Sequence, residues 1–216
     1  MYRIGLIDDE PAELTKVRRT IKVNAPKGME FDFKSYEIPE KREDAIDQIC
    51  SQVIDDIEGM NITALIIDYK IMVKALKVNG TDILKEINDT VSKFPVIILT
   101  ERVEESIQPD HVDADKVYKK KDFFKLEEEY SKEKINHIFD SMVKYVKQRD
   151  ELTLTLSELK KKLESGDRSV IEDVLKLEEK LDEFVPVEQT QIDRTYDANR
   201  MKAIVDLIAE ANKLME

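Results

Sequence analysis

Five short apolar runs in the first 121 residues, separated by segments with helical spacing, constrain the fold of this chain most strongly. Apolar side chains recur every three or four residues in the intervening segments, as in Leu14, Val17 and Ile21. Strands that alternate with helices form parallel sheets with right-handed crossovers, so the pattern predicts a doubly wound α/β domain. The predicted strands are Tyr2–Asp8, Phe31–Glu37, Ala64–Asp68, Pro95–Thr100 and Lys116–Lys120.

Four of these runs end on side chains of the types that commonly bind metals or phosphates. The carboxyl ends of parallel strands meet at one edge of the sheet, where ligands bind. We therefore expect three carboxylates, a hydroxyl and an ammonium to converge there. The first run ends Asp8-Asp9-Glu10-Pro11, the third ends at Asp68, the fourth at Thr100 and the fifth in Lys119-Lys120-Lys121.

This set of residue types favours magnesium-dependent phosphoryl chemistry. Carboxylates gathered at one edge repel one another unless a cation lies among them, and hard oxygen ligands suit Mg²⁺. One carboxylate can then act as a nucleophile toward a phosphoryl group. A lysine and a hydroxyl nearby can hold the phosphoryl oxygens, on which charge builds during transfer.

The residue types and their order along residues 1–121 resemble the receiver domain of two-component response regulators. The resemblance implies a flavodoxin-like, doubly wound, five-stranded parallel sheet. It also implies that Asp8 and Asp9 organise Mg²⁺ and that Asp68 is the phosphoacceptor, with the backbone carbonyl of Lys70 completing the metal site.

Thr100 matches the hydroxyl residue that moves to the phosphoryl group, and Lys120 matches the lysine that pairs with it. Lys119 or Lys121 could hold the place of Lys120 instead. Asn79-Gly80-Thr81-Asp82 resembles the glycine-containing turn that opens the third helix.

Three departures from the receiver pattern bear on function. The segment from Asp68 to Gly80 is about four residues longer than usual, which predicts an enlarged loop beside the phosphoacceptor. Glu101 replaces a residue that is usually small, and could obstruct the site or repel a phosphate. Pro109 lies where the fourth helix is expected, so this helix is predicted to be short or irregular.

Composition narrows the classes of partner. The net charge is −12, with acidic excess in both halves of the chain, which disfavours the phosphate contacts of nucleic-acid binding. No apolar stretch is long enough to span a bilayer. The single cysteine, Cys50, excludes an internal disulfide and follows a helical apolar spacing, so we expect a core residue in a cytoplasmic protein.

Rows of apolar side chains with heptad-like spacing, here called heptad seams, replace the strand pattern after residue 122. Residues 149–164 and 169–184 have equal lengths and predict an antiparallel helical hairpin. Residues 131–148 are then expected to pack on the sheet as part of one continuous helix, with Arg149 at the change of partner. A third seam contains Met201, Ile204, Ile208, Ala211 and Met215. Whether the seams pack within one chain or form a homodimer stays open.

We therefore expect a receiver over residues 1–130 and an all-α helical hairpin or coiled-coil module over residues 131–216. The resemblance implies a signalling protein, not an enzyme, that is phosphorylated on Asp68 by a histidine kinase or phosphotransfer protein. The helical module would then act on a protein target.

Two alternatives stay open: a phosphorylation-independent adaptor, suggested by Glu101, and a Mg²⁺-dependent phosphohydrolase that uses Asp68 as its nucleophile. His137 falls between the seam positions Ile135 and Ile138, which indicates a surface histidine more than a phosphotransfer residue.

Overall fold

The computed structural model describes residues 1–39, 45–73 and 76–186, without the side chains of residues 73, 76 and 77. Residues Met1–Val185 form one compact unit. The predicted division at residue 130 stays a prediction, and the third heptad seam lies outside the described residues.

A five-stranded parallel sheet forms the centre of this unit, as the sequence predicts. Its strand order is β2-β1-β3-β6-β7, which places the first three sheet strands as 2-1-3. This is the order of flavodoxin-like doubly wound folds. The strands are β1 (Tyr2–Ile7), β2 (Phe31–Ser35), β3 (Ala64–Asp68), β6 (Val96–Thr100) and β7 (Val117–Lys119).

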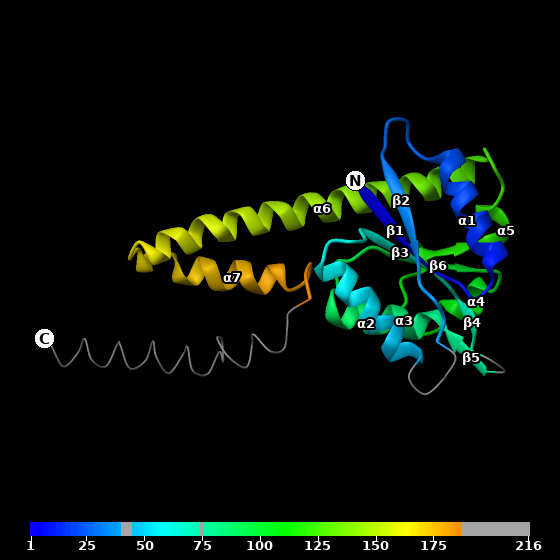
Figure 1. Cartoon of the computed structure of the whole chain (residues 1–216), viewed down its shortest axis with the longest axis horizontal. Coiled ribbons are helices and arrows are strands. Elements are labelled where there is room, and N and C mark those ends of the chain that lie inside the picture. The colour runs from blue at the N-terminus through cyan, green and yellow to red at the C-terminus, as the bar shows by residue number, and fades with distance from the viewer. Residues whose placement is uncertain (40–44, 74–75, 187–216) are drawn as a thin grey trace, which may run out of the picture. The chain divides into compact units, whose positions relative to one another are not determined.

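Helices cover both faces of the sheet because its central strands are apolar on both sides. In β3, Leu65 and Ile67 belong to one core cluster, and Ala64 and Ile66 belong to the other. The first cluster includes side chains of α2 (Ala45–Glu58) and α3 (Gly80–Thr90), and the second includes those of α1 (Pro11–Asn24). Figure 1 shows this three-layered arrangement around the sheet.

The segment after Asp68 differs from the prediction of an enlarged loop. It forms an antiparallel hairpin of β4 (Lys70–Val73) and β5 (Leu76–Asn79), and α3 follows directly at Gly80. Ile71 and Val78 face each other across the hairpin and are buried in the core, whereas Met72 is exposed. The insertion is therefore ordered by apolar side chains on one face, which is typical of half-buried strands.

Three further elements are short. The prediction of a short or irregular fourth helix is confirmed in its first form, because α4 (Val103–Ser106) spans only 4 residues. A 3-10 turn, η1 (Ala114–Lys116), precedes β7, and the single-turn helix α5 (Lys120–Phe123) follows it. Phe123 of α5 is fully buried in the same cluster as α1.

The tail contains the predicted continuous helix and hairpin. Helix α6 (Glu129–Glu164) has 36 residues, and its first half buries Ile135, Ile138 and Phe139 against the sheet domain. After the end of α6 the chain turns at Gly166 and continues through η2 (Arg168–Val170) into α7 (Ile171–Leu181). Helix α7 packs on the part of the tail formed by α6.

Leu156, Val170 and Val174 form the centre of the helical hairpin, and Lys160 pairs with Glu178 at 2.7 Å across it. Within the ranges that the structure describes, no helix has the length and apolar character needed to cross a membrane.

Candidate functional site

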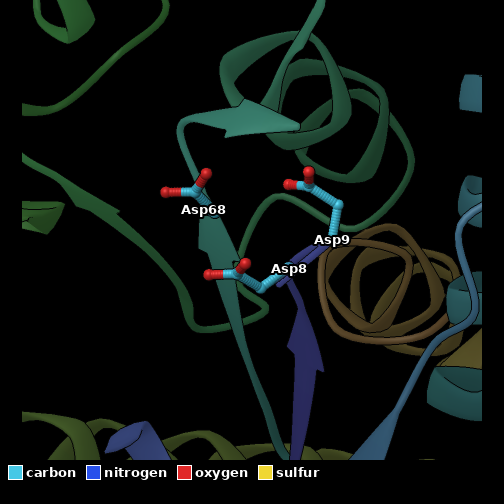
Figure 2. Close-up of side chains that lie close together, drawn as sticks. All are labelled: Asp8, Asp9 and Asp68. Atoms are coloured by element: carbon cyan, nitrogen blue, oxygen red, sulfur yellow. The ribbon is translucent and has the colours of Figure 1, made fainter. Parts of the chain in front are cut away.

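Three carboxylates converge at the carboxyl edge of the sheet. Asp8 and Asp9 follow β1 directly, Asp68 is the last residue of β3, and the two strands pair up to Ile7 and Ile67. One oxygen from each carboxylate lies within 4.8 Å of the others. Figure 2 shows the three side chains turned toward a common space. The predicted convergence of these acids is confirmed.

Lys120, of the three consecutive lysines, enters this acidic cluster. Its ammonium Nζ lies 2.8 Å from Asp68 Oδ1 and 3.0 Å from Asp8 Oδ2. The Lys120 side chain is buried, whereas Lys119 and Lys121 are exposed. Of the three lysines that the sequence left open, Lys120 is thus the one that pairs with the acids, and its role toward a phosphoryl group stays a prediction.

Thr100 occupies the predicted strand end at the edge where the acids lie. It is 2% exposed and follows Leu99, the β6 residue that lies opposite Asp68. Its Oγ1 accepts a hydrogen bond from the Arg102 backbone N–H at 2.9 Å. Among the described residues, no hydrogen bond joins Thr100 to the acidic cluster, so its predicted role requires a movement.

Glu101 is exposed to solvent at the bend that follows β6. In the described part of the chain, no hydrogen bond or ion pair links it to Asp8, Asp9 or Asp68. The prediction that Glu101 obstructs or repels a phosphoryl group stays a prediction.

Local backbone turns orient two of the carboxylates. Asp8 Oδ1 accepts a hydrogen bond from the Glu10 backbone N–H at 2.8 Å, and Asp68 Oδ2 accepts one from Lys70 N–H at 3.1 Å. Aspartates commonly bond the backbone two residues further on in this way. Each of these carboxylates thus keeps its second oxygen for Lys120.

Gly80 allows the close approach of α3 to the end of β3, the strand that carries Asp68. Its N–H donates to the Tyr69 carbonyl at 2.8 Å. A Cβ at this position would lie 2.2 Å from the backbone carbonyl oxygen of Asp68, far inside contact distance. Only glycine allows this approach without displacing the end of β3.

Lys70 ties the inserted hairpin to its surroundings through contacts that the sequence did not reveal. Its Nζ donates to Asn79 Oδ1 at 2.9 Å, lies 3.8 Å from Glu105 Oε2 in α4, and is 4.1 Å from the centre of the Tyr69 ring. The predicted role of the Lys70 backbone carbonyl in metal binding stays a prediction.

Burial dominates the electrostatics of the cluster. It raises the pKa values of Asp8 and Asp68 above the usual aspartate range, although Lys120 partly opposes this. Burial also disfavours the charged form of Lys120, but its hydrogen bonds and ion pairs with Asp68 and Asp8 outweigh burial and raise its pKa. A single ammonium therefore compensates three crowded carboxylates incompletely.

The donor set suits a hard divalent cation. Asp8, Asp9 and Asp68 offer carboxylate oxygens close enough to share one ion, and such oxygens are the ligands that Mg²⁺ prefers. The incomplete charge compensation by Lys120 gives a second reason for the fit, because an added cation would relieve the repulsion among the acids.

Glu13 is a neighbour of the site that sequence reasoning missed. Its Oε2 lies 3.7 Å from Lys120 Nζ, and its Oε1 pairs with Lys16. The available signal was its position in the first turn of α1, directly after the strand that carries Asp8 and Asp9.

Two residues outside the site agree with their sequence interpretations. Cys50 is buried, and burial raises the pKa of its thiol to about 12, as expected for a core residue. His137 is exposed on α6, as expected for a surface histidine.

Comparisons with known proteins give a likeness to a response regulator. Neither a protein-family profile nor a curated protein sequence matches this chain. A solved structure of the RcsB response regulator of Salmonella typhimurium, described for its conformational dynamism in DNA interaction, is similar with a TM-score of 0.42 and 13% identity. That match covers 87% of this chain and 94% of RcsB. The strand order itself assigns a flavodoxin-like doubly wound fold to the sheet.

Proposed function

We propose that this chain is a response-regulator-like signalling module that accepts a phosphoryl group on Asp68. The observation that carries the proposal is the meeting of Asp8, Asp9, Asp68 and Lys120 at one edge of a receiver-like sheet. Receiver-like folds typically serve signalling, and the chemistry here is confined to the chain's own phosphorylation.

The phosphoryl transfer uses one oxygen of Asp68 as the nucleophile. This oxygen forms a bond to phosphorus while the bond between phosphorus and the donor, an imidazole nitrogen of a histidine kinase or phosphotransfer protein, breaks. The product is an acyl phosphate on Asp68, and the donor imidazole retains the bonding electrons.

Asp8, Asp9 and Asp68 would hold Mg²⁺, together with the Lys70 carbonyl that the resemblance implies. When bound, Mg²⁺ would neutralise charge that develops on the transferring oxygens. Lys120 would supply a second positive charge from its place beside Asp68. Thr100 Oγ1 would give up its hydrogen bond from the Arg102 N–H, and its hydroxyl would donate a hydrogen bond to a phosphoryl oxygen.

A chain of short contacts supports transmission from Lys120 to α6. Lys120 is the first residue of α5, and the Ser131 hydroxyl of α6 lies 3.0 Å from the Asp122 carbonyl oxygen and 2.9 Å from that of Phe123. Ser131 is fully buried. Lys119 N–H also donates to the Tyr130 hydroxyl at 3.3 Å. A shift of Lys120 therefore has a direct mechanical route into the first turn of α6.

The output in this proposal is a protein contact made by the helical module. Helix α6 runs without interruption from Ser131 to the hairpin with α7, so a displacement at its start can alter the position of that hairpin. The acidic charge of the chain favours a protein target, or a second copy of this chain, over nucleic acid.

Intact-protein mass spectrometry tests the phosphorylation directly. The full chain is incubated with a small phosphodonor, such as acetyl phosphate, with and without Mg²⁺. We expect a mass gain of one phosphoryl group that needs Mg²⁺ and disappears in Asp68→Asn. Asp89→Asn, a substitution at the end of α3 away from the cluster, is the matched control and should be phosphorylated like the wild type.

A mass gain that survives Asp68→Asn, or none at all, would reject the proposal. In the second case the phosphorylation-independent adaptor would be favoured. The observation that supports this alternative is the hydrogen bond between the Arg102 N–H and Thr100, because it engages the hydroxyl that a phosphoryl group would need.

A further inference from the structure

Three carboxylates, not two, surround the ammonium of Lys120. Its Nζ lies 2.8 Å from Asp68 Oδ1, 3.0 Å from Asp8 Oδ2 and 3.7 Å from Glu13 Oε2. The Glu13 side chain is 14% exposed, so this acid is largely shielded from solvent beside the cluster. Among the described residues, Glu13 is the carboxylate that pairs with Lys120 without belonging to the candidate metal ligands.

Lys120 and a divalent cation need the same two carboxylates. The ammonium donates to Asp8 and contacts Asp68 at hydrogen-bond distance, and both acids are in the candidate ligand set. Two cationic groups that share the same carboxylates at such short distances repel each other. We therefore expect Lys120 to loosen one of these contacts when the acids bind Mg²⁺.

Glu13 is placed to receive the displaced ammonium. Charge-assisted N–H···O bonds have lengths of about 2.7–2.9 Å, so a movement of about 1 Å would bring Nζ into hydrogen-bond contact with Glu13 Oε2. Glu13 lies in the first turn of α1, where the helix dipole favours a negative charge. Its other oxygen, Oε1, accepts a hydrogen bond from Lys16, so the contact with Lys120 uses Oε2 alone.

We propose that Glu13 is a positioning residue that takes over the Lys120 ammonium when the acidic cluster binds Mg²⁺. Lys120 then stays beside Asp68, ready for a phosphoryl group, without competing with the cation. This inference rests on the proposed function, because it assigns a role to Glu13 in the magnesium-loaded state of the same site.

A double-mutant cycle on Mg²⁺ affinity tests the inference. Isothermal titration calorimetry with MgCl₂ is applied to the full chain as wild type, Glu13→Gln, Lys120→Met and the double variant. We expect Glu13→Gln to weaken Mg²⁺ binding about fivefold, because Lys120 then keeps its hold on Asp8 and Asp68. In the Lys120→Met background the same substitution should change the affinity by less than about twofold.

Matched variants separate positioning from other effects. Lys16→Gln removes the other cation that pairs with Glu13 and should not weaken Mg²⁺ binding. Glu13→Asp keeps the charge and should restore part of the lost affinity. Circular dichroism verifies folding, and Lys120→Gln replaces Lys120→Met in the cycle if the latter fails to fold.

Two results would overturn the role of Glu13 alone. The first is equal weakening of Mg²⁺ binding by Glu13→Gln in both backgrounds, which would show that the Glu13 charge acts on the cation without Lys120. The second is no weakening in either background. A wild-type chain that binds no Mg²⁺ would overturn this inference together with the magnesium dependence of the proposed function, so the two failures are distinguishable.

Discussion

At the scale of single residues, the site combines features that the sequence shows with others that only packing reveals. The acids Asp8, Asp9 and Asp68 were predictable because strand ends in a parallel sheet must meet at one edge. Lys120 was the predicted lysine, but the sequence left Lys119 and Lys121 open as alternatives, because three consecutive lysines do not show which ammonium points to the acids.

Gly80 gives a residue-scale prediction about the approach of α3 to the end of β3. Gly80→Ala should lower the free energy of unfolding by about 1–3 kcal/mol, because the new methyl group would overlap the Asp68 carbonyl. It should also slow phosphorylation, since Asp68 must shift. Urea unfolding and the intact-mass assay measure the two effects.

Gly28→Ala is the control for this substitution, because Gly28 has a φ of 81° with open space around it. It should cost about 1 kcal/mol through backbone strain and leave phosphorylation unchanged. Equal phosphorylation rates in Gly80→Ala and Gly28→Ala would contradict the importance of the close approach.

The buried acids also predict how stability depends on pH. Burial raises the pKa values of Asp8 and Asp68 above 3.8, so the folded protein retains protons that the unfolded chain has already released. The contribution of these acids to the free energy of unfolding should therefore fall as the pH rises from 3.8 through their folded-state pKa values.

Urea unfolding of the wild type and of Asp8→Asn/Asp68→Asn measures this contribution in magnesium-free buffer over that pH range. The double variant should gain stability relative to the wild type as the pH rises, because its amides cannot ionise. Parallel stability curves for the two proteins would contradict the electrostatic account.

At the scale of elements, the regular strands and helices followed from apolar periodicity, whereas the β4–β5 hairpin did not. Ile71 and Val78 are separated by a segment with no strong turn signal, so their pairing across the hairpin was not evident. The long α6 was predictable because its heptad spacing continues through Arg149 with no glycine or proline to end the helix.

The contact between α5 and α6 makes an element-scale prediction. Ser131→Ala removes the buried hydroxyl between α6 and the α5 carbonyls, so it should lower the free energy of unfolding by about 1–2 kcal/mol. Phosphorylation of Asp68 should still occur. Hydrogen exchange along α6, however, should respond less to phosphorylation than in the wild type.

Thr155→Ala, which removes an exposed hydroxyl bonded within α6, provides the control and should preserve the response. A full exchange response in Ser131→Ala would exclude Ser131 from the route of transmission.

At the scale of the whole molecule, residues Met1–Val185 form one unit because the helical hairpin returns to the sheet domain. The Tyr145 hydroxyl donates to the Phe184 carbonyl at 2.6 Å, and the Tyr145 ring packs edge-on against Phe94. Lys93 N–H donates to the Glu183 carbonyl at 2.9 Å. The hairpin is therefore anchored at both ends, by α6 and by the residues after α7.

This anchoring predicts how the hairpin loses structure. Leu156→Ala should destabilise the α6–α7 hairpin by about 2–4 kcal/mol, because Leu156 is one of three buried side chains at its centre. Amide exchange should accelerate in α7 and in α6 beyond Arg149, while β1 and β3 keep their protection. Leu154→Ala, at a position 63% exposed, should have little effect. Equal acceleration in the strands would show that the hairpin and the sheet unfold together.

The most direct measurement of the central claim is the position of a bound divalent ion. Crystals of the chain grown with Mn²⁺, an anomalous scatterer that favours the same carboxylate ligands as Mg²⁺, would reveal that position. We expect one anomalous peak within coordination distance of carboxylate oxygens of Asp8, Asp9 and Asp68, with Lys120 still beside Asp68. A peak elsewhere, or none at this edge of the sheet, would contradict it.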